Sequence, residues 1–265
     1  MTGRSGHLLA PDGARIAWRL DGPSEAPVVA LCTMATAAMS IWDGLAADLA
    51  DRWRVLRHDR RGEGDSDPGA PETHSFATYA RDALLVFDAC GARAAHVCGM
   101  AFGSRVAVRI ALDAPGRVRS LALFDATAGP PAPDAARKAG SAEAAQLRLA
   151  AGLAPRAVDR LWFARRDPAG AGLAALALRR EPPWTEGLSA IAAPTLVACG
   201  EQDPNLAGAR RMAREIPAAR FEAMPMTGHG SILDRPDLVA QLLRRFLEDV
   251  EARADGARAG PPGGA

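Results

Sequence analysis

The stretch His96–Ser104, which reads HVCGMAFGS, decides the fold of this chain. Its first, mostly apolar residues predict the end of a buried strand, and Phe102–Asp113 has the pattern of a helix. Gly99 and Gly103 flank the junction, where a sharp turn brings the two backbones too close together for a β-carbon. The residue at the tip of this turn is Ala101. We therefore expect a strand, a strained turn and a helix, with Ala101 at the apex.

Strand-like and helix-like patterns alternate on both sides of this stretch. Short apolar or alternating runs predict strands at His7–Leu9, Arg15–Arg19, Val28–Leu31, Arg54–Leu56, Ala95–Cys98, Val118–Phe124 and Thr195–Cys199. Helical spacing occurs at Trp42–Leu49, Phe76–Cys90, Phe102–Asp113 and Leu238–Leu247. The alternation predicts an α/β fold, a doubly wound and mostly parallel sheet, with an N-terminal antiparallel hairpin around Pro11-Asp12-Gly13. Ligands of such sheets bind outside the carboxyl ends of the strands.

The regular alternation breaks after about Ala126. The next residues are rich in Ala, Arg and Pro, and helical patterns occur only at Ser141–Leu149 and Ala157–Phe163. This region is too long for a simple connection, so we interpret it as an inserted helical lid. The final residues are rich in Gly, Ala and Pro, a composition typical of disorder. The predicted division is a core domain of residues 1–126 and 184–251, a lid of residues 127–183 and a disordered tail of residues 252–265.

Composition excludes several classes of function. The chain has 265 residues, of which 48% are hydrophobic and 24% charged, and its net charge is +1. This balance predicts a globular protein without a nucleic-acid partner. A signal peptide is not predicted, and the longest uncharged stretch, Ala26–Trp42, holds too many polar residues for a membrane span. Cys32, Cys90, Cys98 and Cys199 show no metal-ligand spacing, so we expect reduced thiols in a cytoplasmic protein without metal or cofactor.

Three further motifs carry residues that could act chemically. Asp59–Ser66 (DRRGEGDS) is a Gly-rich loop after a strand, for which we expect a structural role. Asp203 follows the strand at Thr195–Cys199, where it could be a catalytic acid or the N-cap of the next helix. His229, in the loop Thr227–Gly230 (TGHG), could be a catalytic base or a solvated loop histidine.

In this order the motifs resemble those of the α/β-hydrolase family, over nearly the whole chain. The short lid makes the chain most similar to small esterases and 3-oxoadipate enol-lactone hydrolases. In that family a G-x-S-x-G elbow presents a serine nucleophile, followed along the chain by an acid and a histidine. The resemblance puts Ala101 at the nucleophile position, Asp203 at the acid position and His229 at the base position. Asp59–Ser66 is similar to the family's D-x-R-G-x-G-x-S loop.

The resemblance also implies an oxyanion hole and a pocket for a small molecule. One backbone N–H donor would come from Phe102, directly after the nucleophile position. The second would come from Ala35 or Met34, in a loop that reads TMATA where the family often has His-Gly. The candidate apolar walls are Trp162, Phe163 and Trp184, for which plain packing is an equal alternative, and Arg165 or Arg166 could meet a carboxylate.

The alanine at the apex limits the chemistry. A methyl group cannot attack a carbonyl carbon, and removing the serine of such a triad costs about 10⁶-fold in turnover. Ser104 lies one helical turn further on and Cys98 precedes the turn, so neither is expected at the tip. We therefore do not expect hydrolysis through an acyl-enzyme.

Three hypotheses follow, and the sequence leaves them open. The chain is a disabled ester or lactone hydrolase, or a Ser-to-Ala variant of one. Alternatively, it is a lyase, cyclase, dehydratase or isomerase in which His229, oriented by Asp203, acts as general base. In the third it is a non-catalytic small-molecule binding protein, although that reading gives no reason to keep the acid and the histidine.

Overall fold

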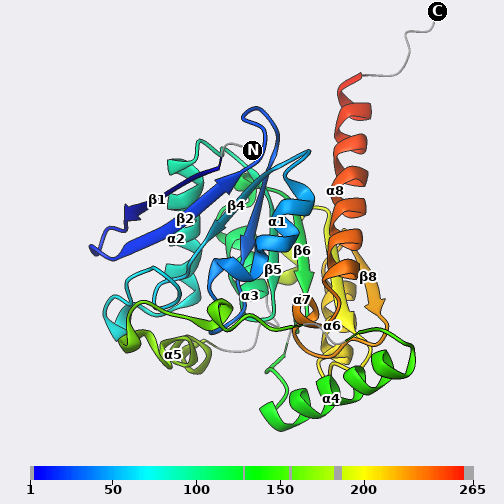
Figure 1. Cartoon of the computed structure of the whole chain (residues 1–265). Coiled ribbons are helices and arrows are strands. Elements are labelled where there is room, and N and C mark those ends of the chain that lie inside the picture. Colours follow the sequence, from blue (N-terminus) through cyan, green and yellow to red (C-terminus); the bar gives the residue numbers. More distant parts are fainter. Residues whose placement is uncertain (1–2, 128, 155–156, 182–186, 260–265) are drawn as a thin grey trace, which may run out of the picture.

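An eight-stranded sheet runs through the centre of the molecule (Figure 1). The computed structural model describes residues 3–127, 129–154, 157–181 and 187–259. The strands are β1 (Arg4–Leu9), β2 (Arg15–Asp21), β3 (Val28–Cys32), β4 (Arg54–His58), β5 (Ala95–Met100), β6 (Val118–Phe124), β7 (Thr195–Gly200) and β8 (Ala219–Met224).

The strand order is β1-β2-β4-β3-β5-β6-β7-β8. β2 pairs antiparallel with β1 and with β4, and all the other pairs are parallel. The predicted fold class, including the N-terminal hairpin, is confirmed. The prediction missed β8, an edge strand whose alternating polar and apolar residues are only half buried.

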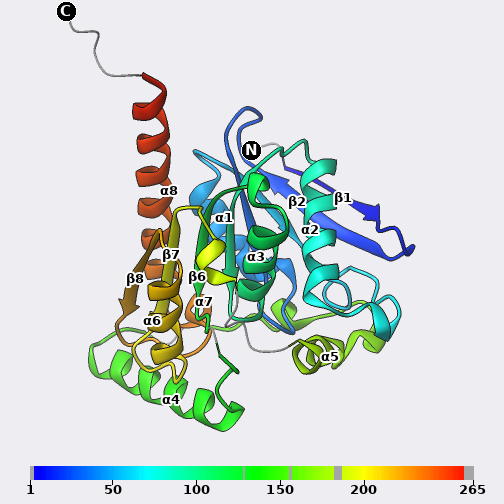
Figure 2. The same ribbon diagram turned by 180° about the vertical axis from the view of Figure 1, so that it is seen from behind.

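Helices cover both faces of the sheet (Figures 1 and 2). One face carries α2 (Phe76–Ala89), α3 (Phe102–Asp113) and α6 (Leu206–Glu215), and the other carries α1 (Asp43–Leu49) and α8 (Pro236–Ala259). Successive strand residues point to opposite faces, so Val97 packs in the first hydrophobic cluster and its neighbour Cys98 in the second. Strands buried on both faces explain the continuous apolar runs in the sequence.

The chain reverses its direction across the sheet at β3. From β3 it goes to β4 on one side, then crosses to β5 on the other side and continues to β8. The loops after β3 and β5 therefore part at a topological switch point, which is where open α/β sheets bind ligands. This topology brings the loop at Met34 next to the turn at Ala101.

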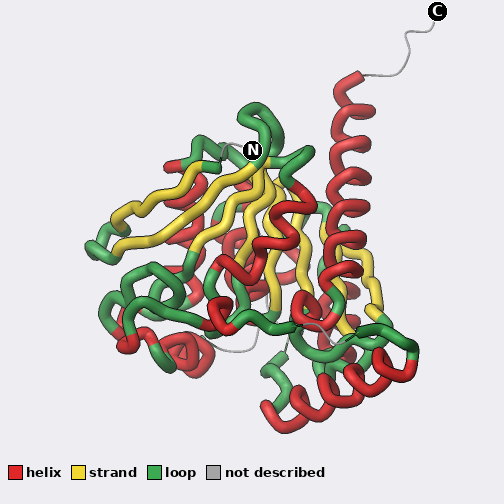
Figure 3. The backbone as a smooth tube through the Cα atoms, viewed as in Figure 1, coloured by secondary structure: helices red, strands yellow, loops and turns green. Residues whose placement is uncertain are grey.

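The long connection between β6 and β7 lies at the carboxyl ends of the strands (Figure 3). It contains α4 (Asp134–Ala150), α5 (Leu173–Arg180) and two 3₁₀ turns, η4 (Arg160–Phe163) and η5 (Pro168–Gly170). α4 includes the helix predicted at Ser141–Leu149 but begins earlier, directly after Pro133. The helix predicted at Ala157–Phe163 is only the turn η4, and the prediction missed α5.

The last helix is longer than the sequence indicates. α8 continues to Ala259, so it takes in residues that the sequence assigned to a disordered tail from about Ala252. Figure 1 shows its final turns extending past the rest of the molecule. Among the helices that the structure describes, none combines the length and apolar character needed to cross a bilayer. The remaining short helices are η1 (Met39–Trp42), η2 (Pro71–Thr73), η3 (Pro115–Arg117), η6 (Leu188–Ala190) and α7 (Ser231–Asp234).

Candidate active site

Ala101 occupies the strained turn between β5 and α3. Its backbone has φ 50° and ψ −109°, and its N–H donates to the Phe124 carbonyl at 2.8 Å. A β-carbon on Gly99 would lie 2.4 Å from the Gly103 carbonyl oxygen, and one on Gly103 would lie 2.1 Å from that of Cys32. The two glycines are thus required by close backbone packing. Positive φ at a non-glycine residue costs about 1–3 kcal/mol, so the surrounding structure imposes this conformation.

His229 and Asp203 form a hydrogen-bonded pair. Asp203 follows β7, and His229 lies in the loop between β8 and α7. The imidazole Nδ1 is 2.8 Å from the Asp203 Oδ2. The Asp203 side chain is fully buried, whereas that of His229 is 16% exposed. Because an ionised carboxylate only accepts hydrogen bonds, it favours the tautomer with the proton on Nδ1, which leaves Nε2 free to accept a proton.

The surroundings of His229 favour its protonated form. Burial lowers the pKa of the imidazole, but the hydrogen bond to Asp203 and the negative charges of Asp125 and Asp203 raise it by more. The net result is a pKa above the ordinary value of 6.5. A base with such a pKa is effective near neutral pH.

Asp125 holds the loop that carries the histidine. It follows β6 directly, with φ 52°, and its Oδ2 accepts hydrogen bonds from the N–H groups of Gly230 at 3.1 Å and Ser231 at 2.6 Å. Its other oxygen, Oδ1, is buried without a partner among the described residues. Burial and the nearby Asp203 raise the pKa of Asp125 to about 6. The sequence signal for this residue is its place directly after the buried strand Val118–Phe124.

Asn205 is a second residue that sequence reasoning missed. Its amide Nδ2 lies 3.3 Å from His229 Nδ1, and its Oδ1 accepts from the Ala132 N–H at 2.8 Å, which ties the segment before α4 to the site. Asp203 Oδ1 accepts from the Asn205 N–H at 2.9 Å. The N-cap of α6 is Asn205, so Asp203 is not the helix cap that was the alternative for it; its carboxylate contacts the imidazole and the N–H of that capping residue.

Asp125, Cys199 and Asp203 place potential metal-ligand atoms within 4.8 Å of one another. Burial strongly raises the pKa of the Cys199 thiol, and the thiol lies 3.6 Å from Asp203 Oδ2. The Asp203 oxygens already contact His229 and Asn205. This donor set fits an internal hydrogen-bond network better than a metal site.

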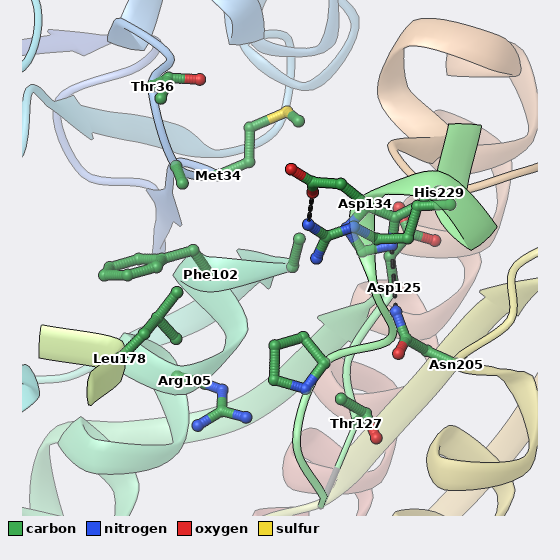
Figure 4. A pocket seen from close by; sticks show the side chains of 14 residues that line it. Met34, Thr36, Phe102, Arg105, Asp125, Thr127, Asp134, Leu178, Asn205 and His229 are labelled. Atoms are coloured by element: carbon green, nitrogen blue, oxygen red, sulfur yellow. Dashed lines mark hydrogen bonds and ion pairs between the residues drawn. The ribbon is translucent and has the colours of Figure 1, made fainter. Parts of the chain in front are cut away.

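A cavity of about 420 Å³ opens beside this network (Figure 4). Its walls come from the loop after β3, the elbow, the end of β6, α5 and the start of α4. The lining residues are Met34, Ala35, Thr36, Ala101, Phe102, Arg105, Asp125, Thr127, Pro131, Asp134, Arg137, Leu178, Asn205 and His229. Ala101 and His229 thus face one cavity, and Asp203 lies behind the histidine.

The proposed oxyanion residues Phe102, Ala35 and Met34 also line this cavity. Phe102 is the first residue of α3, so its N–H has no acceptor within the helix. The loop with Met34 and Ala35 turns at Thr36, whose φ is 63°. The geometry brings both candidate sources of backbone donors to the elbow.

Two of the expected pocket walls lie elsewhere. Trp162 and Phe163 belong to η4, which packs against η1 rather than over the elbow. Trp162 is half buried in the hydrophobic cluster on the α1 side, and its carbonyl accepts from the Ala38 N–H at 2.8 Å; Phe163 is 37% exposed. Neither lines the cavity, where Leu178 of α5 provides the apolar wall instead. Trp184 lies outside the described residues.

The arginines considered for a carboxylate are also away from the cavity. Arg165 donates to Glu63 at 2.7 Å, and the Arg166 side chain is 53% exposed.

The neighbours of Ala101 do not offer a substitute nucleophile. Ser104 Oγ is buried and donates to the Phe124 carbonyl at 3.0 Å. Cys98 is buried within the sheet, where burial strongly raises the pKa of its thiol. The Gly-rich loop is structural: Asp59 accepts from the N–H groups of Met39 and Asp65, and Ser66 bonds to backbone groups.

Comparison with known proteins places this architecture in a family. The model of the alpha/beta hydrolase family matches residues 32–242. A putative carbamate hydrolase RutD of Variovorax paradoxus is 28% identical, over 89% of this chain and 97% of its own length. The 3-oxoadipate enol-lactonase 1 of Acinetobacter baylyi is 23% identical, over 90% of this chain and 95% of its own length. The crystal structure of a hydrolase from Pseudomonas aeruginosa is 29% identical, with a TM-score of 0.73, over 92% of this chain and 98% of that chain. The match over most of the chain confirms the resemblance seen in the motifs: the chain belongs to the alpha/beta hydrolase family.

Proposed function

We propose that this chain is an enzyme that hydrolyses a small carbonyl compound without a covalent intermediate. The observation that carries the proposal is the buried Asp203–His229 pair beside a cavity that Ala101 also lines. A binding protein has no need of an oriented, basic imidazole at this place. The names of the relatives suggest the substrate class, an ester, lactone or carbamate, and the four buried thiols support a cytoplasmic location.

The proposed reaction uses water as the nucleophile. His229 Nε2 takes a proton from a water molecule, and the hydroxide oxygen attacks the carbonyl carbon. The carbonyl oxygen becomes an oxyanion, which accepts hydrogen bonds from the N–H groups of Phe102 and of Ala35 or Met34. The bond to the leaving group then breaks, and the imidazolium returns its proton to that group. The methyl group of Ala101, smaller than a serine side chain, leaves room for the water.

Turnover of a panel of small esters, lactones and carbamates tests the proposal. We expect the parent chain to hydrolyse at least one of them, and His229→Gln to lower kcat/KM by roughly 10²–10⁴-fold. His7→Gln, on the edge strand β1, is the matched control and should leave the rate unchanged.

The other hypotheses give different results in the same assay. If only Ala101→Ser turns over esters, the chain is a disabled hydrolase. If the product forms by isomerisation or elimination, without addition of water, His229 acts on the substrate itself. Equal rates for the parent and His229→Gln would refute the role of the histidine altogether.

A further inference from the structure

Arg105 is a buried cation on the wall of the cavity. It lies on α3 four residues after Ala101, which is about 6 Å along the helix axis. The residue is only 8% exposed, and one of its nitrogens, Nη2, donates to the Gly129 carbonyl at 2.8 Å. Its guanidinium carbon also lies 5.9 Å from the centre of the Phe76 ring. Among the described residues, no carboxylate lies within ion-pair distance of it.

The other buried arginines are neutralised within the protein. Arg57 pairs with Asp21, Arg60 with Glu63 at 3.2 Å, and Arg61 with Asp82 at 2.7 Å. A buried charge without a counter-ion is costly, and proteins normally supply one. Burial lowers the pKa of Arg105, although the charge of Glu181 opposes this effect. Arg105 therefore differs from the other buried arginines: Glu181 acts on it without forming an ion pair, and it faces a cavity where a ligand could supply a closer negative charge.

The other charged groups of the cavity favour an anion at Arg105 rather than near the histidine. Arg137 is already paired with Asp134. Asp125 lies beside His229 and would repel a second negative group there. Figure 4 shows the Arg105 guanidinium on the Leu178 side of the cavity, away from His229.

We propose that Arg105 determines specificity by binding a carboxylate of the substrate. The inference rests on the proposed function and narrows its substrate class. The substrate is a small carbonyl compound that carries its carboxylate a few carbon atoms from the reacting carbonyl. Its reacting end lies at Ala101 and His229, and its charged end lies at Arg105.

Binding measurements test this inference separately from catalysis. The probes are the monomethyl esters of succinate, glutarate and adipate, each compared with the neutral compound in which a carboxamide replaces the carboxylate. Dissociation constants are measured by calorimetry in the His229→Gln background, where the proposed reaction is blocked. We expect at least one carboxylate to bind tenfold or more tightly than its carboxamide. Because this comparison measures binding alone, it remains a valid test even if the chain hydrolyses none of the compounds in the panel.

Substitutions on α3 then test whether the preference for the carboxylate over the carboxamide depends on Arg105. Arg105→Met should bring the two affinities to within twofold, and Arg105→Lys should keep part of the preference. Arg109→Met, one turn further along α3 and paired with Asp113 at 2.6 Å, is the control and should keep all of it. Three results would overturn the inference: equal affinities of carboxylate and carboxamide in the His229→Gln protein, no measurable carboxylate binding up to millimolar concentrations, or a preference that survives Arg105→Met. The first two of these results do not depend on any Arg105 variant folding.

Discussion

Replacing Asp125 by Asn separates the two effects that this residue has on His229. The carboxylate holds the loop through Gly230 and Ser231, and its charge raises the pKa of the imidazole. An asparagine oxygen can still accept from both N–H groups, but it carries no charge. We therefore expect Asp125→Asn to keep the position of His229 and to lower its pKa.

The size of the effect follows from the geometry. A carboxylate oxygen of Asp125 lies within 4.8 Å of a carboxylate oxygen of Asp203, and Asp203 Oδ2 is 2.8 Å from the imidazole Nδ1. At a distance of up to ~8 Å and an effective dielectric constant of about 20, two unit charges interact by about 2 kcal/mol. At this largest separation, a fully ionised Asp125 raises the pKa of His229 by about 1.5. Because Asp125 itself has a pKa of about 6 and is not fully ionised near neutrality, we expect a decrease of about 1.

Titration of the imidazole signals by NMR measures this change without any substrate. Burial lowers the pKa of His58 and of His96 to about 4, so neither overlaps with His229. The parent should show a His229 pKa above 6.5, and Asp125→Asn a pKa lower by about 1. Since only neutral imidazole is a base, the rising limb of kcat/KM against pH should move to lower pH by the same amount. An unchanged His229 pKa in Asp125→Asn would refute the electrostatic reasoning, and so would an increase.

Further predictions concern the elbow and the acid. Ala101→Ser should form an acyl-enzyme with activated esters, detected as a burst and as an added mass on the protein. Ala101→Gly should raise the free energy of unfolding by about 1 kcal/mol, because relief of the positive φ exceeds the entropy cost of glycine; denaturant titration measures it. Gly103→Ala should destabilise the fold by more than about 3 kcal/mol in the same titration, since its β-carbon would overlap the Cys32 carbonyl. Asp203→Asn should lower kcat/KM by roughly 10²–10⁴-fold through loss of the Nδ1–H tautomer, while far-UV circular dichroism stays unchanged.

Local patterns predicted most of the sheet because its strands are short, apolar and buried on both faces. The strand Val118–Phe124 and the helix Phe102–Asp113 have the bounds expected from the sequence. β8 was missed because an edge strand is half exposed and alternates Arg220 and Glu222 with apolar neighbours. The helices of the lid were harder to predict from the sequence than the strands. An Ala- and Arg-rich segment has weak periodicity, and Ala157–Phe163 forms only one 3₁₀ turn where it packs on η1.

The same distinction holds for the candidate site: motifs predicted some of its residues, whereas others depend on how the lid packs. Ala101, Asp203 and His229 were predicted because their motifs resemble, in this order, those of the α/β-hydrolase family. The topology of the sheet brings the three loops together. The cavity wall depends on how the lid packs, which no short motif encodes. Leu178 therefore lines the cavity, whereas the expected Trp162 and Phe163 do not. Arg105 could have been anticipated, since it lies one helical turn from Ala101 in the same helix.

Intact mass spectrometry of the protein, quenched during steady turnover of a substrate found in the panel, distinguishes direct attack by water from catalysis through a covalent intermediate. Water activated by His229 leaves the chain unmodified at every time point while product accumulates. We expect the unmodified mass for the parent and an acyl adduct for Ala101→Ser under the same conditions. An adduct of the acyl group on the parent chain would show that a side chain, and not water, is the nucleophile.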